Sequence, residues 1–160
     1  MNTTMITQMK FRKNKKPFTP EEFKDIYSRV PRVTVDLIVK TPKGIVLTLR
    51  THYAWKNQWH FPGGTIFYKE TVAQAIDRVA RDEIGQPVEV VKLLGYIEYP
   101  SEEKQRGFGS TVSMAFLCKT NATDFTVNED ASRVEVFATP PENLIVEQSE
   151  FLRAHQDDTL

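Results

Sequence analysis

The sequence is poor in the residues that several kinds of scaffold and site require. It has one cysteine and three histidines among 160 residues, and 21 basic side chains balance 21 acidic ones. A single cysteine excludes an intrachain disulfide framework and is compatible with the cytosol. The balanced charge argues against long nucleic acids or an anionic membrane as the main partner. A small anionic ligand stays compatible with it, because a local site does not need a global field.

Long apolar runs are missing as well. No stretch approaches the roughly 20 apolar residues that span a bilayer. Residues 1–16 are basic, but no apolar segment follows the basic residues, so they do not read as a secretory signal. We expect a disordered basic tail at residues 1–16, a single domain over residues 17–160, and a cytoplasmic location.

The pattern of apolar and turn residues predicts strands broken by helices. Residues 33–39 and 45–50 are rich in β-branched side chains and flank a Thr-Pro-Lys-Gly turn, which predicts a hairpin. The other expected elements are helices within 17–27 and 141–155, strands at 88–99 (bent near Gly95), 111–119 and 134–137, and a mobile polar loop at 100–109. Such a mixture predicts an α/β sandwich around a mixed sheet.

The best-defined helix begins after Thr71. Thr71 and Gln74 form a capping-box pattern, in which each side chain satisfies a free backbone N–H of the first turn. Gly85, followed by Pro87, marks the end of the helix. Between these limits the apolar residues recur at the spacing of one helix face: Val72, Ala75, Ile76, Val79 and Ala80.

Glu83 lies in an unexpected place on this helix. At about 100° per residue it falls within roughly 20° of Val72, inside the apolar stripe. It is also in the last turn, where the helix dipole disfavours an anion by roughly 0.3–1 kcal/mol. Desolvating an unpaired carboxylate costs more. A positive group should therefore compensate Glu83, either a basic side chain or a divalent cation with a phosphate ligand.

Residues around this helix resemble the signature of the Nudix hydrolases. That signature reads G, five residues, E, seven residues, R-E-aliphatic-x-E-E-x-G-aliphatic. The matching positions are Gly64, Glu70, Arg78, Glu83 and Gly85. The resemblance implies a Nudix-type α/β/α sandwich around a mixed β-sheet over about residues 31–155. It also implies metal-dependent hydrolysis of a nucleoside diphosphate linked to another group.

Three positions depart from the signature: Val79 and Asp82 stand where it has Glu, and Gln86 where it has an aliphatic residue. A carboxylate at position 79 would lie one turn from Glu83 on the same face. Without it, a site with several metal ions is not expected. Asp82 is a metal ligand or the partner of Arg78, four residues earlier, in an ordinary helix salt bridge.

The resemblance implies Mg²⁺ (or Mn²⁺) as the cofactor. Glu83 is the first expected ligand and Asp82 the second, and a backbone carbonyl of Gly63 or Gly64 completes the same side. Oxygen ligands of this kind suit either ion.

A closer resemblance within the family is to the GDP-mannose mannosyl hydrolases, over residues 18–85. They share a Leu-x-x-Arg-Thr strand end and a Trp-x-Phe-Pro-Gly-Gly segment with this chain, and they too lack the Glu after the signature Arg. They use one magnesium ion and attack by water at the sugar carbon. The resemblance makes Arg50 the diphosphate-binding residue. Thr65 departs from the pattern, because those enzymes have Arg there.

The general base is a second departure. The mannosyl hydrolases use a histidine in the loop before the last core strand, and residues 126–133 contain none. Glu129 or Asp130 is the alternative, as a base or a metal ligand, against the simpler interpretation of solvated loop acids.

The aromatic and polar segment 51–61 leads into the glycine pair. It can supply a stacking surface for a base, and His52, Tyr53 and His60 are candidate substrate-binding residues. Trp59 and Phe61 are expected to pack beneath the site.

Three functions follow. The first is hydrolysis of a nucleoside diphosphate sugar in the manner of the mannosyl hydrolases. The second is a Nudix pyrophosphatase acting on ADP-ribose or another nucleoside diphosphate derivative. The third is a non-catalytic domain that binds a nucleotide or a protein. The expected partners are a small-molecule nucleoside diphosphate and a second copy of the chain in a homodimer, with no nucleic acid and no membrane.

Overall fold

Strand β1 (Arg32–Thr41) is the centre of the sheet in the computed structural model, which describes residues 17–127 and 131–159. It runs parallel to β6 (Thr111–Lys119) along its length, and its end forms an antiparallel hairpin with β2 (Gly44–Arg50). The strand order is β3-β2-β1-β6-β5, with β4 paired to β1 and β7 paired to β2. The sheet is therefore mixed, as the sequence predicts.

The remaining elements complete the sheet and cover it. The strands are β3 (Trp59–His60), β4 (Gly63–Thr65), β5 (Glu89–Glu98) and β7 (Ala131–Phe137); the helices are α1 (Pro20–Tyr27), α2 (Val72–Ile84), α3 (Glu102–Arg106), α4 (Val146–Ala154) and α5 (Gln156–Thr159).

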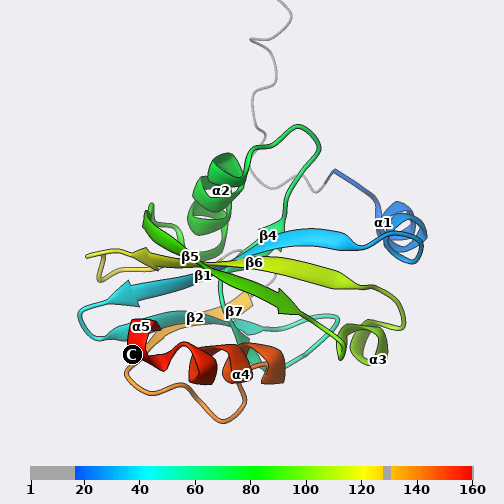
Figure 1. Ribbon diagram of the computed structural model, residues 1–160. Helices are drawn as coiled ribbons and strands as arrows, with labels where there is room; N and C mark the ends of the chain where they lie inside the picture. The colour runs from blue at the N-terminus through cyan, green and yellow to red at the C-terminus, as the bar shows by residue number, and fades with distance from the viewer. Residues whose placement is uncertain (1–16, 128–130, 160) are drawn as a thin grey trace, which may run out of the picture.

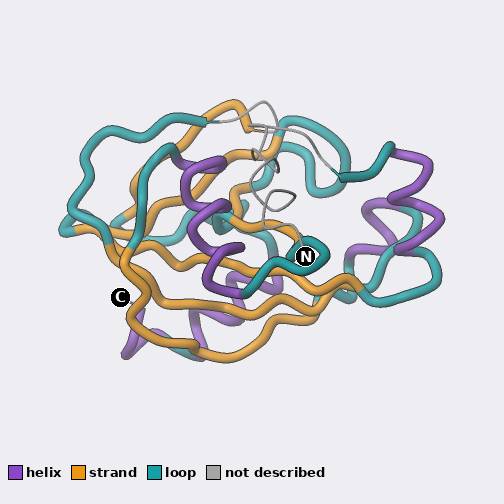
Figure 2. The backbone as a smooth tube through the Cα atoms, turned by 90° about the horizontal axis from the view of Figure 1, so that it is seen from above, coloured by secondary structure: helices purple, strands orange, loops and turns teal. Residues whose placement is uncertain are grey.

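Helices cover both faces of the sheet. Figure 1 shows α2 above it and α4 below it, and Figure 2, turned by 90°, shows α2 crossing over the strands. Side chains alternate along a strand. Val35 and Leu37 of β1 accordingly pack in the core under α2, whereas Ile38 packs in the core on the α4 side. This arrangement confirms the α/β/α sandwich.

Most expected elements are present with small changes of boundary. The 33–39 and 45–50 hairpin is confirmed, and Thr19 caps α1 through a capping box with Glu22. β5 has a register shift at Leu93/Gly95, which confirms the bend near Gly95. The final helix begins only at Val146, because the backbone before it pairs with β3 instead of coiling.

The segment 100–109 differs from the expected mobile loop. It contains α3, whose Glu102 is buried and bonded to three other side chains. Two of the charged residues that suggested a solvated loop, Glu102 and Arg106, are therefore packed at the end of the sheet, whereas Glu103 and Lys104 are exposed. The expected basic tail at 1–16 lies outside the described residues. Within the described chain, no helix is long and apolar enough to cross a membrane.

Candidate functional site

Helix α2 frames the site, and its local signals act as the sequence predicts. The Thr71 and Gln74 capping box is present, and Gly85 ends the helix with φ of 70°. A Cβ at Gly85 would lie 2.0 Å from Thr126 Oγ1, so both the backbone and the space require glycine here. Val79 is only 1% exposed. It extends the apolar stripe into the core, where a carboxylate would be desolvated.

Arg78, in the middle of α2, connects the helix to Glu70 in the preceding loop and to Thr65 of β4. Its Nε and Nη2 donate to the two carboxylate oxygens of Glu70 at 2.7 and 2.9 Å, and Nη2 also donates to the Thr65 carbonyl at 2.7 Å. Its guanidinium group lies over the Phe67 ring, 3.9 Å from the centroid. Burial raises the pKa of Glu70, but the hydrogen bonds from Arg78 and Phe67 N–H outweigh it and lower the pKa overall. Arg78 thus pairs with Glu70, and its expected alternative pairing with Asp82 is wrong.

The two acids at the other end of α2 lie side by side in sequence and are both half-buried. Asp82 and Glu83 are in the last turn before Gly85. Within residues 17–127 and 131–159, no group of three or more His, Cys, Asp or Glu side chains is arranged to hold a metal ion. Glu129 and Asp130, the expected loop acids, lie outside the described residues. The described acids therefore fit one side of an oxygen-ligand site, and not a complete one.

The glycine pair in β4 is fixed by close contacts on both sides of the sheet. A Cβ at Gly63 would lie 2.3 Å from Asp36 Oδ1, and a Cβ at Gly64 would lie 3.0 Å from Val79 Cγ2. Gly63 and Gly64 pair with Asp36 and Val35 of β1. The glycines let β4 lie between a buried carboxylate and α2, so their carbonyls have a defined position.

Asp36 begins a chain of buried hydrogen bonds that reaches α4. Tyr99 donates to Asp36 Oδ2 at 2.5 Å, Gln148 Nε2 donates to the Tyr99 hydroxyl at 2.9 Å, and Gln148 Oε1 accepts from Phe61 N–H at 2.7 Å. Burial raises the pKa of Asp36 to about 6, against the opposing effect of the Tyr99 hydrogen bond and the charges of Arg32 and Arg50. Burial also raises the pKa of Tyr99.

Arg50 is the last residue of β2, directly before the loop that leads to β3. Its Nε donates to the Ala54 carbonyl at 2.9 Å, and its guanidinium group lies 5.8 Å from the centroid of the Trp55 ring. Arg50 pairs with Ala131 of β7, while Thr126 N–H bonds the carbonyl of Ile84 at the end of α2. Thr126 therefore lies at the end of α2, and Ala131 lies beside Arg50.

The loop after Arg50 presents aromatic side chains to solvent from a strained backbone. Tyr53, Trp55 and Asn57 all have φ between 55° and 63°. Residues other than glycine rarely adopt this left-handed backbone conformation. Tyr53 is 74% exposed, and its ring meets that of exposed His52 at 6.4 Å. Trp55 is buried and donates from Nε1 to Ser101 Oγ. His52 and Tyr53 are thus accessible beside Arg50.

His60 is in a different environment. It is 7% exposed, with Nδ1 2.6 Å from the Phe61 carbonyl and Nε2 3.0 Å from Thr48 Oγ1. Burial and the charge of Arg50 lower its pKa to about 3, so the ring is neutral, with Nδ1–H donating and Nε2 accepting. The prediction that His60 contacts substrate gains no support from this geometry. Trp59 and Phe61 are buried, as expected.

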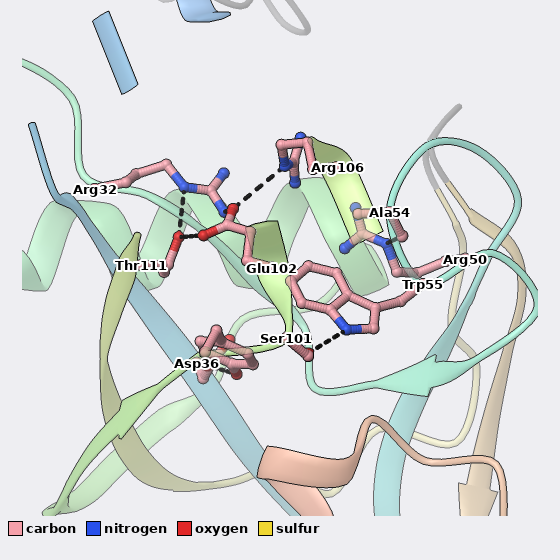
Figure 3. A network of polar contacts seen from close by, with 10 residues as sticks. Arg32, Asp36, Arg50, Ala54, Trp55, Ser101, Glu102, Arg106 and Thr111 are labelled. Atoms are coloured by element: carbon pink, nitrogen blue, oxygen red, sulfur yellow. Dashed lines mark hydrogen bonds and ion pairs between the residues drawn. The ribbon is translucent and has the colours of Figure 1, made fainter. Parts of the chain in front are cut away.

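A second polar cluster lies at the end of the sheet beside Arg50. Figure 3 shows Arg32 and Arg106 approaching Glu102 from two sides, with Thr111 completing the group. Arg106 is also within the electrostatic range of Arg50.

Sequence reasoning missed Asp36, Tyr99, Gln148 and the Arg32–Glu102–Arg106 group. Asp36 had a signal, because a single acid interrupts the apolar segment 33–39. Glu102 and Arg106 have the i, i+4 spacing of a helix pair inside the supposed loop. Tyr99 and Gln148 had no signal, because their partners are distant in sequence.

Comparison with known proteins identifies the class. Residues 30–158 match the NUDIX domain model. The chain is 32% identical over 127 residues to the low-salt glycan biosynthesis protein Agl8 of Haloferax volcanii, which covers 78% of this chain and 81% of that protein. This protein belongs to the Nudix family.

Other relatives extend the picture. An ADP-ribose pyrophosphatase of Methanocaldococcus jannaschii is 29% identical over 107 residues, which are 67% of this chain and 62% of that protein. Among solved structures, a MutT protein from Methanosarcina mazei has a TM-score of 0.69 at 14% identity, over 80% of this chain and 95% of that one. The NUDIX domain of Shewanella oneidensis NrtR, complexed with ADP ribose, has a TM-score of 0.64 at 17% identity, over 89% and 95%. These structures support the fold alone.

Proposed function

We propose that this protein is a divalent-metal-dependent hydrolase that splits the diphosphate of a nucleoside diphosphate linked to a sugar or a similar group. The observation that carries the proposal is the arrangement of the matching signature residues around α2. Glu70, Arg78 and the Thr65 carbonyl lock the loop before α2, and Asp82 and Glu83 lie in the last turn. The similarity to an ADP-ribose pyrophosphatase favours attack at phosphorus over attack at the sugar.

The chain's own residues have distinct parts in this proposal. Arg50 binds the diphosphate, since a guanidinium group matches two phosphate oxygens. His52 and Tyr53 contact the base or the sugar from the exposed loop. Glu129 or Asp130 orients or deprotonates the attacking water.

Mg²⁺ (or Mn²⁺) would be held by Glu83, Asp82 and the carbonyl of Gly63 or Gly64. When bound, such an ion neutralises negative charge that builds up as the diphosphate is cleaved. The pairing of Gly63 and Gly64 with β1 holds the backbone that carries these carbonyls.

Attack at the sugar carbon, as in the GDP-mannose mannosyl hydrolases, is the second candidate. It is favoured by Val79, whose burial leaves no carboxylate one turn before Glu83. The relative named for glycan biosynthesis is compatible with a nucleotide sugar as substrate.

The products separate the candidates. The protein is incubated with ADP-ribose, UDP-glucose and GDP-mannose, with Mg²⁺ or Mn²⁺, and the products are identified by ³¹P NMR. A nucleoside monophosphate with a sugar phosphate supports the pyrophosphatase. An intact nucleoside diphosphate with a free sugar overturns it in favour of the second candidate. Absence of turnover on every substrate overturns both and leaves the non-catalytic binding domain. The homodimer stays a prediction, to be tested by sedimentation.

A further inference from the structure

The polar group around Glu102 contains more positive than negative charge. Arg32 Nη2 and Arg106 Nε lie 2.9 and 3.2 Å from the same carboxylate oxygen, Glu102 Oε1. The other oxygen accepts a hydrogen bond from Thr111 Oγ1 at 2.6 Å. Glu102 is 1% exposed and each arginine side chain is 15% exposed. One buried carboxylate thus serves two guanidinium groups that have both lost most of their water.

The two arginines are held unequally. Arg32 makes well-formed hydrogen bonds to Glu102 and, from Nε, to Thr111 Oγ1 at 3.0 Å. Arg106 meets Glu102 as an ion pair only, and its buried Nε has no hydrogen-bond partner among the described residues. Burial and the nearby charges of Arg32 and Arg50 lower its pKa to about 10, against the opposing effect of the Glu102 carboxylate. A charge that is buried without full compensation is costly, and an oxyanion at this place would relieve the cost.

The surroundings fix the direction of the guanidinium groups. Both guanidinium groups lie against the Phe23 ring, with centroid distances of 5.4 Å for Arg32 and 5.5 Å for Arg106, and Phe108 packs on Phe23. Arg106 also lies 5.9 Å from the Phe108 centroid. Aromatic faces attract guanidinium groups and leave their N–H edges for other partners. α1 and α3 therefore preorganise the pair from outside the sheet.

The pair is continuous with the proposed diphosphate site. Arg32 begins β1 and Arg50 ends β2, and the two strands are antiparallel, so both residues lie at the same end of the sheet. Figure 3 shows Arg106 between Arg32 on one side and Arg50 on the other. The three arginines form a row, and a diphosphate bound at Arg50 accounts for only one end of it.

We propose that Arg32 and Arg106 bind a second oxyanion of the substrate, a carboxylate or a phosphate carried by the group that is linked to the nucleoside diphosphate. The proposal rests on the proposed function and narrows its substrate class to acidic derivatives. With a neutral sugar Arg106 still shares the single Glu102 carboxylate with Arg32, whereas an acidic group forms further charge-assisted hydrogen bonds to the two arginines.

The test compares matched substrates on the same protein sample, so that any loss of folded protein cancels. UDP-glucuronate with UDP-glucose tests the carboxylate, and ADP-ribose 1″-phosphate with ADP-ribose tests the phosphate. We expect kcat/KM to favour the acidic member of at least one pair by about tenfold or more, the effect of one hydrogen bond to a charged group. The pair that shows the preference identifies the source of the oxyanion.

Arg106→Gln should bring the ratio of kcat/KM for the acidic and neutral substrates close to one. Arg106→Lys should give a ratio between one and the wild-type value. The matched control is Arg29→Gln, which removes a charge at the same corner from a side chain that is 74% exposed and paired with Asp25. It should not change the ratio. Equal use of acidic and neutral substrates by the wild type overturns the proposal, as does an Arg106→Gln protein that loses activity on both members by the same factor.

Titration calorimetry of the same pairs keeps this inference separate from the proposed function. If no substrate is hydrolysed, the proposed function fails. The ratio of the dissociation constants of the neutral and acidic members still tests whether Arg32 and Arg106 bind an oxyanion. A preference for the acidic member that Arg106→Gln abolishes supports the subsite. Equal dissociation constants overturn it.

Discussion

Tyr99 and Asp36 form a buried hydrogen bond that ties the end of β5 to the central strand. The donor–acceptor distance is 2.5 Å, and both groups are shielded from water by α4 through Gln148. The carboxylate that it stabilises has its other oxygen against Gly63, where a side chain would overlap it. The position of the glycine pair in β4 therefore depends on a polar contact in the core, on the face opposite α2.

Asp36 should make the protein less stable as pH rises through the acid range. Its pKa is raised from 3.8 to about 6 by burial, so the folded state binds a proton more tightly than the unfolded state between these values. The free energy of unfolding therefore falls as pH rises from about 4 to 6, by up to about 3 kcal/mol from this group. Asp36→Asn removes the effect, so its stability relative to wild type should rise over the same window. Urea unfolding at pH 4, 5, 6 and 7 measures the difference; a constant difference contradicts the prediction.

Gly63→Ala should destabilise the protein through contact with Asp36. The new Cβ would lie 2.3 Å from Asp36 Oδ1 and 3.0 Å from the Val35 carbonyl, and overpacking of this kind costs about 1–3 kcal/mol. Asp36→Ala opens space, so the double variant should lose less stability than the sum of the single variants, by about 0.5 kcal/mol or more. Gly107→Ala is the control, since nothing lies within 4 Å of its Cβ. Its effect should add to that of Asp36→Ala, and additivity for Gly63→Ala as well would rule out the contact.

Arg78→Met should remove the lock between α2 and the preceding loop. It leaves Glu70, which is nearly buried, without its ion pair, a change that costs about 3 kcal/mol. Because the folded-state pKa of Glu70 is lowered from 4.5, the stabilisation is present above that pH and is lost as pH falls below it. The gap between wild type and Arg78→Met in urea unfolding should thus narrow from pH 6 to pH 3. Arg81→Met, at an exposed pair with Asp77, is the control and should leave stability nearly unchanged. A gap that stays constant with pH assigns the loss to packing alone.

The sequence predicts those parts of the structure that depend on residues close to one another along the chain. The caps and stripe of α2 depend on residues within a few positions of each other, and Thr71, Gln74, Val79 and Gly85 act as expected. The hairpin between β1 and β2 has the same origin.

The contacts that shape the site are of long range. Tyr99 and Asp36 are 63 residues apart, and Arg32 and Glu102 are 70 apart. No periodicity links such pairs, and a run of charged residues such as Glu102 to Arg106 looks the same whether it is solvated or packed against aromatic rings. Arg78 illustrates the limit, since the helix spacing pointed to Asp82, whereas the structure pairs Arg78 with Glu70, eight residues earlier in the chain.

Glu83 remains the residue on which the proposed chemistry depends. If it holds the metal ion, Glu83→Gln should lower kcat/KM by at least about 10–100-fold and raise the metal concentration needed for half activity. Asp82→Asn should show a smaller effect of the same kind if it is the second ligand. Asp77→Asn is the matched control, because Asp77 lies on the same helix in an exposed pair with Arg81. The measurement is the rate of product release across a magnesium and manganese titration, on a substrate that the wild type hydrolyses, together with the unfolding midpoint of each variant. A Glu83→Gln protein that folds and keeps wild-type turnover would show that another group holds the ion.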